Sequence, residues 1–387
     1  MRKFWLVCIV LLLGCAALPL CAQNFEVPES GRGALQVTPV SALSSLMADT
    51  SMMTYYGNPV RSIYVNQPAA SIVKIPDAQA QFGIGAGTTI VAVIDTGIDP
   101  THPALAGSIV PGYDFLRKTA GIPNEWLDLT PAQVNALGGS ATAPVAQKTV
   151  AATVSSSAVP ILDQSTVVIL DAGGSTLPGE FGHGTMVAGL IHLVAPGVKI
   201  MPIKAFGADG TATVPDVVSA IKFAVDHGAK VINMSFSVNS GNPNLQKVIN
   251  YAASKGVVCV AASGNDGTSS PVYPAAYLPV IAVGSVNNND MRSLFSNYGS
   301  MAARTSAPGE ALITTFPGNN YAGVWGTSFS TALVSGAAAL ALQVTPKATN
   351  AASAIAEFGK PIDQDMGDMR LQILNALSYL MRVPAHH

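Results

Sequence analysis

The sequence has few charged residues and almost no cysteine after its first 21 residues. Asp, Glu, Lys and Arg make up 11% of the 387 residues, hydrophobic residues make up 49%, and no run of Lys or Arg stands out. A chain of this composition has enough apolar surface to build a large core, which excludes intrinsic disorder. The lack of a basic patch argues against nucleic acid as a partner.

Cysteine is confined, with one exception, to the first 21 residues. Only Cys259 lies beyond them, so the rest of the chain cannot form an internal disulfide, and we expect no disulfide-linked partner. Cys259 stands in the apolar run 257–260, where we expect a small buried residue of a strand. A nucleophilic role would require exposure and a neighbouring base.

The N-terminus has the pattern of an export signal. The basic pair Arg2-Lys3 precedes an apolar run over residues 4–13 that is too short to span a bilayer, and residues 20–22 offer a cleavage site. We therefore predict a signal peptide over residues 1–22 and a secreted protein, periplasmic or extracellular. The run Leu-Leu-Gly before Cys15 also resembles a lipobox, so lipid anchoring through Cys15 stays open as an alternative.

Beyond the signal, the hydrophobic pattern indicates one large domain over residues 67–383. Short apolar runs such as residues 89–94 alternate with helical patterns such as residues 214–227. This alternation is typical of an α/β fold with a mainly parallel central sheet flanked by helices. A long helix rich in Ala, Ser and Gly is expected over residues 328–343, and its small side chains predict close packing in the core.

Two regions depart from this alternation. Residues 23–66 are irregular, and we expect a short N-terminal extension or the remnant of a propeptide. Residues 116–179 are rich in Ala, Ser and Val and poor in charge. We expect an insertion there, which forms either a β-hairpin arm or a partly disordered loop.

Three short segments carry polar residues that a buried core would not require. Asp95 follows the apolar run 89–94, at the edge where α/β folds bind ligands. His183 in Gly-His-Gly-Thr and Ser328 in Gly-Thr-Ser each begin a helical pattern. Singly, such residues are ordinary turn formers or helix caps. Together, in the order Asp, His, Ser, they match one of the known orders of a catalytic triad.

The sequence around these residues resembles the subtilase family of serine proteases. Other segments match as well, and they follow the family's order from about residue 69 to about residue 383. The matching segments are Val-Ile-Asp95-Thr-Gly-Ile-Asp, Gly-His183-Gly-Thr-Met-Val-Ala-Gly, Val231-Ile-Asn-Met-Ser235, Ala262-Ser-Gly-Asn265, Tyr273-Pro-Ala275, Phe295-Ser-Asn-Tyr-Gly299, Ala307-Pro-Gly309 and Gly-Thr-Ser328-Phe-Ser-Thr-Ala.

The resemblance implies a subtilisin-like three-layer fold and a serine endopeptidase. It implies that Ser328 is the nucleophile, that His183 is its general base and acid, and that Asp95 orients His183. It also implies that the Asn265 side chain stabilises the oxyanion, together with the backbone N–H of Ser328 at the start of its helix.

Substrates implied by the resemblance are peptides or proteins, bound as an extended strand against strand edges. The residues that would line the substrate site are Ser235, Phe236, Ser237, Ala261, Ser263 and Gly264. Ser237 and Val238 stand where many relatives have glycine, so the family's specificity does not carry over to this chain.

No metal site or cofactor is expected, and we expect a monomer. The chain runs from His183 to Pro196 without the calcium-binding loop of many subtilases, and neither an EF-hand pattern nor His-Glu-x-x-His occurs. The main alternative is a catalytically weak or inactive subtilase-fold binding protein. A nucleotide-binding protein, suggested by the glycines of residues 83–87, is disfavoured because they precede a strand.

Overall fold

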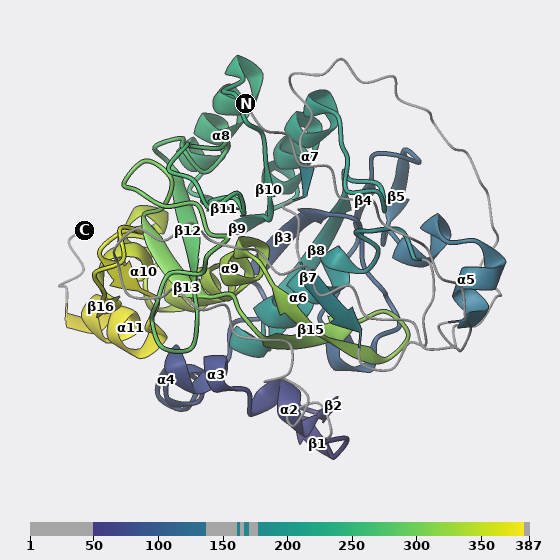
Figure 1. Cartoon of the computed structure of the whole chain (residues 1–387), viewed down its shortest axis with the longest axis horizontal. Helices are drawn as coiled ribbons and strands as arrows, with labels where there is room; N and C mark the ends of the chain where they lie inside the picture. The colour runs from purple at the N-terminus through teal and green to yellow at the C-terminus, as the bar shows by residue number, and fades with distance from the viewer. Residues whose placement is uncertain (1–48, 137–160, 163–165, 170–176, 383–387) are drawn as a thin grey trace, which may run out of the picture. The chain divides into compact units, whose positions relative to one another are not determined.

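The structure is a computed structural model, and it describes residues 49–136, 161–162, 166–169 and 177–382 (Figure 1). A ten-stranded sheet of the order β16-β17-β13-β12-β11-β9-β3-β8-β4-β5 dominates it. All pairings from β17 to β4 are parallel, and only the outermost pairs β16–β17 and β4–β5 are antiparallel. The strands are β3 (Ile90–Asp95), β4 (Gly112–Asp114), β5 (Thr119–Gly121), β8 (Lys199–Lys204), β9 (Val231–Met234), β11 (Val258–Ala262), β12 (Val280–Val286), β13 (Thr305–Pro308), β16 (Lys360–Pro361) and β17 (Met369–Arg370).

Two hydrophobic cores cover the two faces of this sheet. Successive side chains of a strand point to opposite faces, and in β3 Val91 and Val93 belong to one core while Ala92 and Ile94 belong to the other. The first core contains the helices α6 (His183–Val194), α9 (Thr327–Val344), α10 (Ala348–Glu357) and α11 (Ile373–Arg382), and the second contains α7 (Val214–Asp226) and α8 (Pro243–Ser254). The predicted α/β fold with a mainly parallel sheet flanked by helices is therefore confirmed.

Helix α9 begins one residue before the predicted start and is buried from Thr327 to Ala341. Among the described residues it is the helix long and apolar enough to cross a membrane, and 83% of its apolar window is buried inside the protein. Its small residues let it pack against α6, as their composition predicts.

Regular structure begins earlier than the hydrophobic pattern indicates. Strands β1 (Met52–Tyr55) and β2 (Asn58–Arg61) form a hairpin, and the helices α2 (Ser62–Val65), α3 (Pro68–Ile72) and α4 (Ile75–Phe82) follow. The hydroxyl groups of Tyr55 and Tyr64 donate to carbonyls of α6, those of Leu193 and Gly189, at 2.6 Å each. Residues 52–65 are thus anchored to α6. The predicted signal peptide lies outside the described residues.

The region 116–179 is only partly described. Its described elements are the end strand β5, the 3-10 helix η2 (Glu125–Asp128), the helix α5 (Pro131–Ala136) and the strands β6 (Ile161–Leu162) and β7 (Thr166–Ile169). Strands β6 and β7 do not pair with each other. Strand β6 pairs with β10 (Phe236–Ser237), and β7 joins β15 (Asn320–Trp325) and β14 (Leu312–Phe316) in a three-stranded sheet. One more 3-10 helix, η1 (Pro103–Leu105), follows β3.

Candidate active site

The three residues singled out by their motifs lie at the ends of elements that meet at the carboxyl edge of the sheet. Asp95 is the last residue of β3, His183 is the first residue of α6, and Ser328 is in the first turn of α9. The imidazole Nδ1 of His183 lies 2.9 Å from each carboxylate oxygen of Asp95. All three side chains are 0% exposed.

A glycine beside His183 allows α6 to approach the end of β3 this closely. A Cβ atom on Gly184 would stand 2.1 Å from the carbonyl oxygen of Gly97 and 3.3 Å from the Cβ of Asp95. The backbone N–H of Gly184 instead donates to the hydroxyl of Thr96 at 3.0 Å. The Gly-His-Gly sequence therefore has a steric cause, because any larger residue would push the imidazole away from the carboxylate.

The charge of Asp95 governs the electrostatics of His183. Burial lowers the pKa of the imidazole. The charge and hydrogen bond of Asp95, with smaller contributions from the charges of Glu180 and Glu125, outweigh this effect and raise the pKa to about 9. The second ring nitrogen, Nε2, is buried and has no hydrogen-bond partner. The ring packs beside Phe329, whose ring centre is 5.5 Å away.

The hydroxyl of Ser328 does not bond to His183 in this structure. It donates to the backbone carbonyl of Ser235 at 3.2 Å, and the hydroxyl of Ser235 donates to the carbonyl of Ser328 at 2.9 Å. Ser235 is held in turn by Asn233, and Asn233 by Ser335, through side-chain hydrogen bonds of 2.9 Å each. This buried polar chain ties the end of β9 to α9 and fixes the backbone beside Ser328.

Asn265 lies in the loop after β11 and contacts the residue before Ser328. Its side-chain oxygen accepts from both the backbone N–H and the hydroxyl of Thr327, at 2.9 Å each. These bonds fix the carboxamide next to the first turn of α9, where the free N–H groups and the dipole of the helix favour a negative charge. The structure therefore brings Asn265 and Ser328 together.

Motif reasoning missed one acidic residue of this site. Glu125 is fully buried, and one of its oxygens accepts from the hydroxyl of Thr96 and from the N–H of Gly184 at 3.2 Å, while the other accepts from the hydroxyl of Thr185. Burial raises the pKa of Glu125 to about 7, although the two threonine hydrogen bonds oppose the shift. No local pattern around Glu125 marks it, because all these partners are distant in sequence.

The six residues predicted to bind substrate lie around the same edge but play unequal parts. Ser235 precedes β10, and Phe236 and Ser237 form it. The Phe236 side chain is buried and packs on Phe206 at 5.1 Å between ring centres, so only its backbone is available to a peptide. Ala261 lies in β11 with its side chain in the second core, Ser263 is buried, and Gly264 has a φ of +99°. A Cβ on Gly264 would stand 2.4 Å from the amide nitrogen of Asn297.

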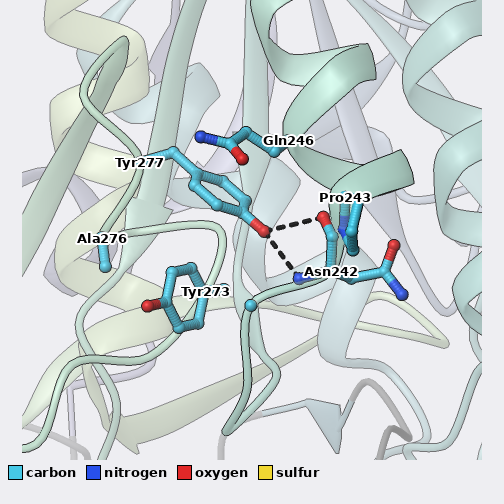
Figure 2. Close-up of a pocket in the computed structure, with 7 residues that line it drawn as sticks. Asn242, Pro243, Gln246, Tyr273, Ala276 and Tyr277 are labelled. Atoms are coloured by element: carbon cyan, nitrogen blue, oxygen red, sulfur yellow. Dashed lines mark hydrogen bonds between the residues drawn. The ribbon is translucent and has the colours of Figure 1, made fainter.

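A pocket of about 400 Å³ lies beyond the end of β10 (Figure 2). It is lined by Gly241, Asn242, Pro243, Gln246, Tyr273, Ala276 and Tyr277. The hydroxyl of Tyr277 donates to the carbonyl and accepts from the N–H of Asn242, at 2.9 Å each, as the dashed lines show. No residue of the Asp95, His183 and Ser328 group lines this pocket.

Two further expectations concern Cys259 and metals. Cys259 is buried in β11, as expected for a small core residue of a strand. Burial raises the pKa of its thiol to about 12. Within the described ranges, no three His, Cys, Asp or Glu side chains gather in a way that could hold a metal ion. Helix α6 leads to β8 through only four residues, 195–198.

Fold, strand order and the clustered Asp, His and Ser together define a serine hydrolase of the three-layer α/β type. The sequence model of the subtilase family matches residues 86–366, which is well over half of the chain. The chain therefore belongs to the subtilase family, and the predicted resemblance and the serine endopeptidase class are confirmed.

The relatives are named as proteases. Thermitase from Thermoactinomyces vulgaris is 35% identical over 281 residues, which cover 70% of this chain and 80% of the relative. The thermophilic serine proteinase of Bacillus sp. strain AK1 is 35% identical over 250 residues, which cover 65% of this chain but only 51% of the relative. Subtilisin BL from Lederbergia lenta is 39% identical over 193 residues, which cover 46% of this chain and 71% of the relative.

Proposed function

We propose that the chain is a secreted serine endopeptidase that hydrolyses peptide bonds through an acyl-enzyme on Ser328. The observation that carries this proposal is the buried pair of Asp95 and His183, 2.9 Å apart, beside the helix that begins at Thr327 and presents Ser328. A buried carboxylate against one imidazole nitrogen leaves the other nitrogen to handle a proton.

In the proposed reaction, Ser328 Oγ attacks the scissile carbonyl while Nε2 of the neutral His183 takes its proton, so activity should rise with pH as His183, with a pKa of about 9, loses its proton. The same imidazole then protonates the leaving amine, and Asp95 holds the ring in the required tautomer and stabilises the imidazolium. Ser328 must turn from the carbonyl of Ser235 toward His183 for this step. Water, activated by His183, hydrolyses the acyl-enzyme.

The oxyanion that forms on attack needs donors that are already in place. We assign this role to the N–H of Ser328, backed by the dipole of α9, and to the amide NH₂ of Asn265, whose oxygen is tied to Thr327. Removal of one such donor from a subtilisin costs about 10²–10³ in kcat. We expect Asn265→Ala to lose activity on that scale with little effect on KM.

Peptide or protein substrates are proposed to bind as a strand against β10, with Ser263 and Gly264 near the residue before the scissile bond. The side chain of Ser237 stands in this strand where many subtilases have glycine, and it narrows the choice of substrates. We further propose that the chain acts as a monomer, that residues 1–22 direct export, and that Cys15 is the alternative lipidation point. N-terminal sequencing of the exported protein and of a Cys15→Ser variant tests the last two points.

The proposed chemistry is tested with a fluorophosphonate probe and a peptide library. Wild-type protein should be labelled and should cleave peptides, and Ser328→Ala should do neither. Ser219→Ala should behave as wild type, because Ser219 is an exposed residue of α7 whose hydroxyl donates to the carbonyl of Pro215. Equal cleavage by wild type and Ser328→Ala would refute the mechanism. Absence of labelling in every variant, including a double variant with Ile161→Pro and Leu162→Pro, would favour the inactive binding protein.

A further inference from the structure

Strand β6 occupies the edge to which a substrate peptide is proposed to bind. Its residues pair antiparallel with β10, Leu162 opposite Phe236 and Ile161 opposite Ser237. A peptide that binds by strand addition needs the N–H and C=O groups of that same edge. The chain therefore already places one of its own segments where a substrate would lie.

Strand β7 occupies the backbone on the other side of Ser328. It pairs antiparallel with β15, from Thr166 opposite Trp325 to Ile169 opposite Ala322. Trp325 is three residues before Ser328, and Ser235, which accepts the Ser328 hydroxyl, directly precedes β10. The two strands thus flank the nucleophile from two separate elements.

Chain connectivity sets how these two strands relate to Ser328. Only three residues separate Leu162 from Thr166, and four Cα–Cα steps reach at most about 15 Å. The end of β6 and the start of β7 therefore lie within that distance of each other.

Burial of the reacting groups agrees with this placement. Ser328 and His183 are 0% exposed, and an endopeptidase must open its nucleophile to an incoming peptide. Since β10 carries β6, and β15 carries β7, an external peptide cannot form its strand pairing without displacing part of this chain.

We propose that β6 and β7 form an internal, substrate-like inhibitor, and that the enzyme acts on other peptides only after this arm leaves β10. This inference rests on the proposed function of Ser328. A tethered segment has an effective concentration of about millimolar. An arm that binds β10 with a dissociation constant of about 0.1 mM would therefore reduce the accessible fraction about tenfold.

The test is a double variant, Ile161→Pro with Leu162→Pro, because it removes both N–H groups of β6 and therefore the one that bonds to β10 in the antiparallel ladder. The matched control is Ile161→Ala with Leu162→Ala, which keeps those groups. The rate of fluorophosphonate labelling of Ser328 should rise about tenfold in the proline variant relative to wild type, and less in the alanine control. A synthetic peptide of residues 159–169 should slow labelling again, whereas a scrambled peptide should not.

The state of each chain is checked by intact mass before labelling. A cut between Leu162 and Thr166 that is absent in Ser328→Ala and forms in wild type at a rate independent of protein concentration also supports the placement, because cleavage of one copy by another would slow on dilution. If the proline variant does not fold, the peptide of residues 159–169 should still inhibit a wild-type chain that has been cut. Equal labelling of intact wild type and the folded proline variant, with no inhibition by the peptide, would overturn the inference and leave the proposed function standing.

Discussion

Glu125 provides the sharpest test of the electrostatics in this site. Its carboxylate is fully buried and accepts hydrogen bonds from Thr96, Thr185 and Gly184. Burial raises its pKa from 4.5 to about 7, and one pKa unit corresponds to about 1.4 kcal/mol. Ionisation of Glu125 in the folded protein therefore costs about 3 kcal/mol.

The sign of the pH dependence follows from linkage. Because the folded pKa is raised, the contribution of this group to stability is fully present below pH 4.5 and is lost as the pH rises through 7. Glu125→Gln imitates the protonated acid, with an oxygen to accept from Thr96 and Gly184 and an NH₂ that can donate to the Thr185 hydroxyl. The difference in unfolding free energy, variant minus parent, should thus be about 3 kcal/mol larger at pH 7 than at pH 4.5.

Denaturant unfolding at several pH values measures this difference. Both proteins carry Ser328→Ala, so that self-digestion does not interfere. The control is Glu357→Gln, at an exposed position at the end of α10, which should show no such divergence. Parallel curves of unfolding free energy against pH for the Glu125 variant and its parent would show that ionisation of the buried carboxyl does not cost about 3 kcal/mol.

Three further predictions concern the same region. Asp95→Asn removes the charge that contributes most to raising the pKa of His183 to about 9. The pH midpoint of activity should therefore move to lower pH, and kcat should fall by about 10⁴. An unchanged midpoint in the pH–rate profile would contradict this prediction. Gly184→Ala places a Cβ 2.1 Å from the carbonyl of Gly97, so activity should be lost together with about 2–3 kcal/mol of stability, measured by thermal unfolding. Burial lowers the pKa of His192 to about 4, so its stabilising effect is present above pH 6.5 and about 3 kcal/mol is lost as the pH falls through 4. The unfolding free energy of His192→Asn should therefore fall less than that of wild type as the pH is lowered from 6.5 to 4. Equal losses in the two proteins would rule this out.

The site residues that can be predicted from motifs are those marked by a short stretch of sequence around each of them. Asp95 ends a purely apolar strand, and His183 and Ser328 begin helices after glycine. Such signals depend on backbone turns and close approaches within a few residues. The alternation of strands and helices predicts the parallel sheet for the same reason.

The parts that sequence alone does not predict depend on contacts between distant segments. Glu125 contacts Thr185 across 60 residues and Thr96 across 29, and it lies in a stretch that the hydrophobic pattern indicates only as an insertion. Residues 52–65 carry little periodicity, yet Tyr55 and Tyr64 bond to α6. The sequences of β6 and β7 contain apolar residues but do not predict that these strands pair with β10 and β15, because the tertiary fold determines which strands pair.

The hydrogen bonds around Ser328 and the pairing of β6 describe one resting arrangement. The Ser328 hydroxyl donates a hydrogen bond to the carbonyl of Ser235, while His183 Nε2 is buried without a partner. An unsatisfied buried nitrogen costs about 1–3 kcal/mol, and either water or the serine hydroxyl would satisfy it once the β10 edge is open. Departure of β6 would open the β10 edge to a peptide, and for catalysis the Ser328 hydroxyl must in addition turn from the carbonyl of Ser235 to the imidazole of His183.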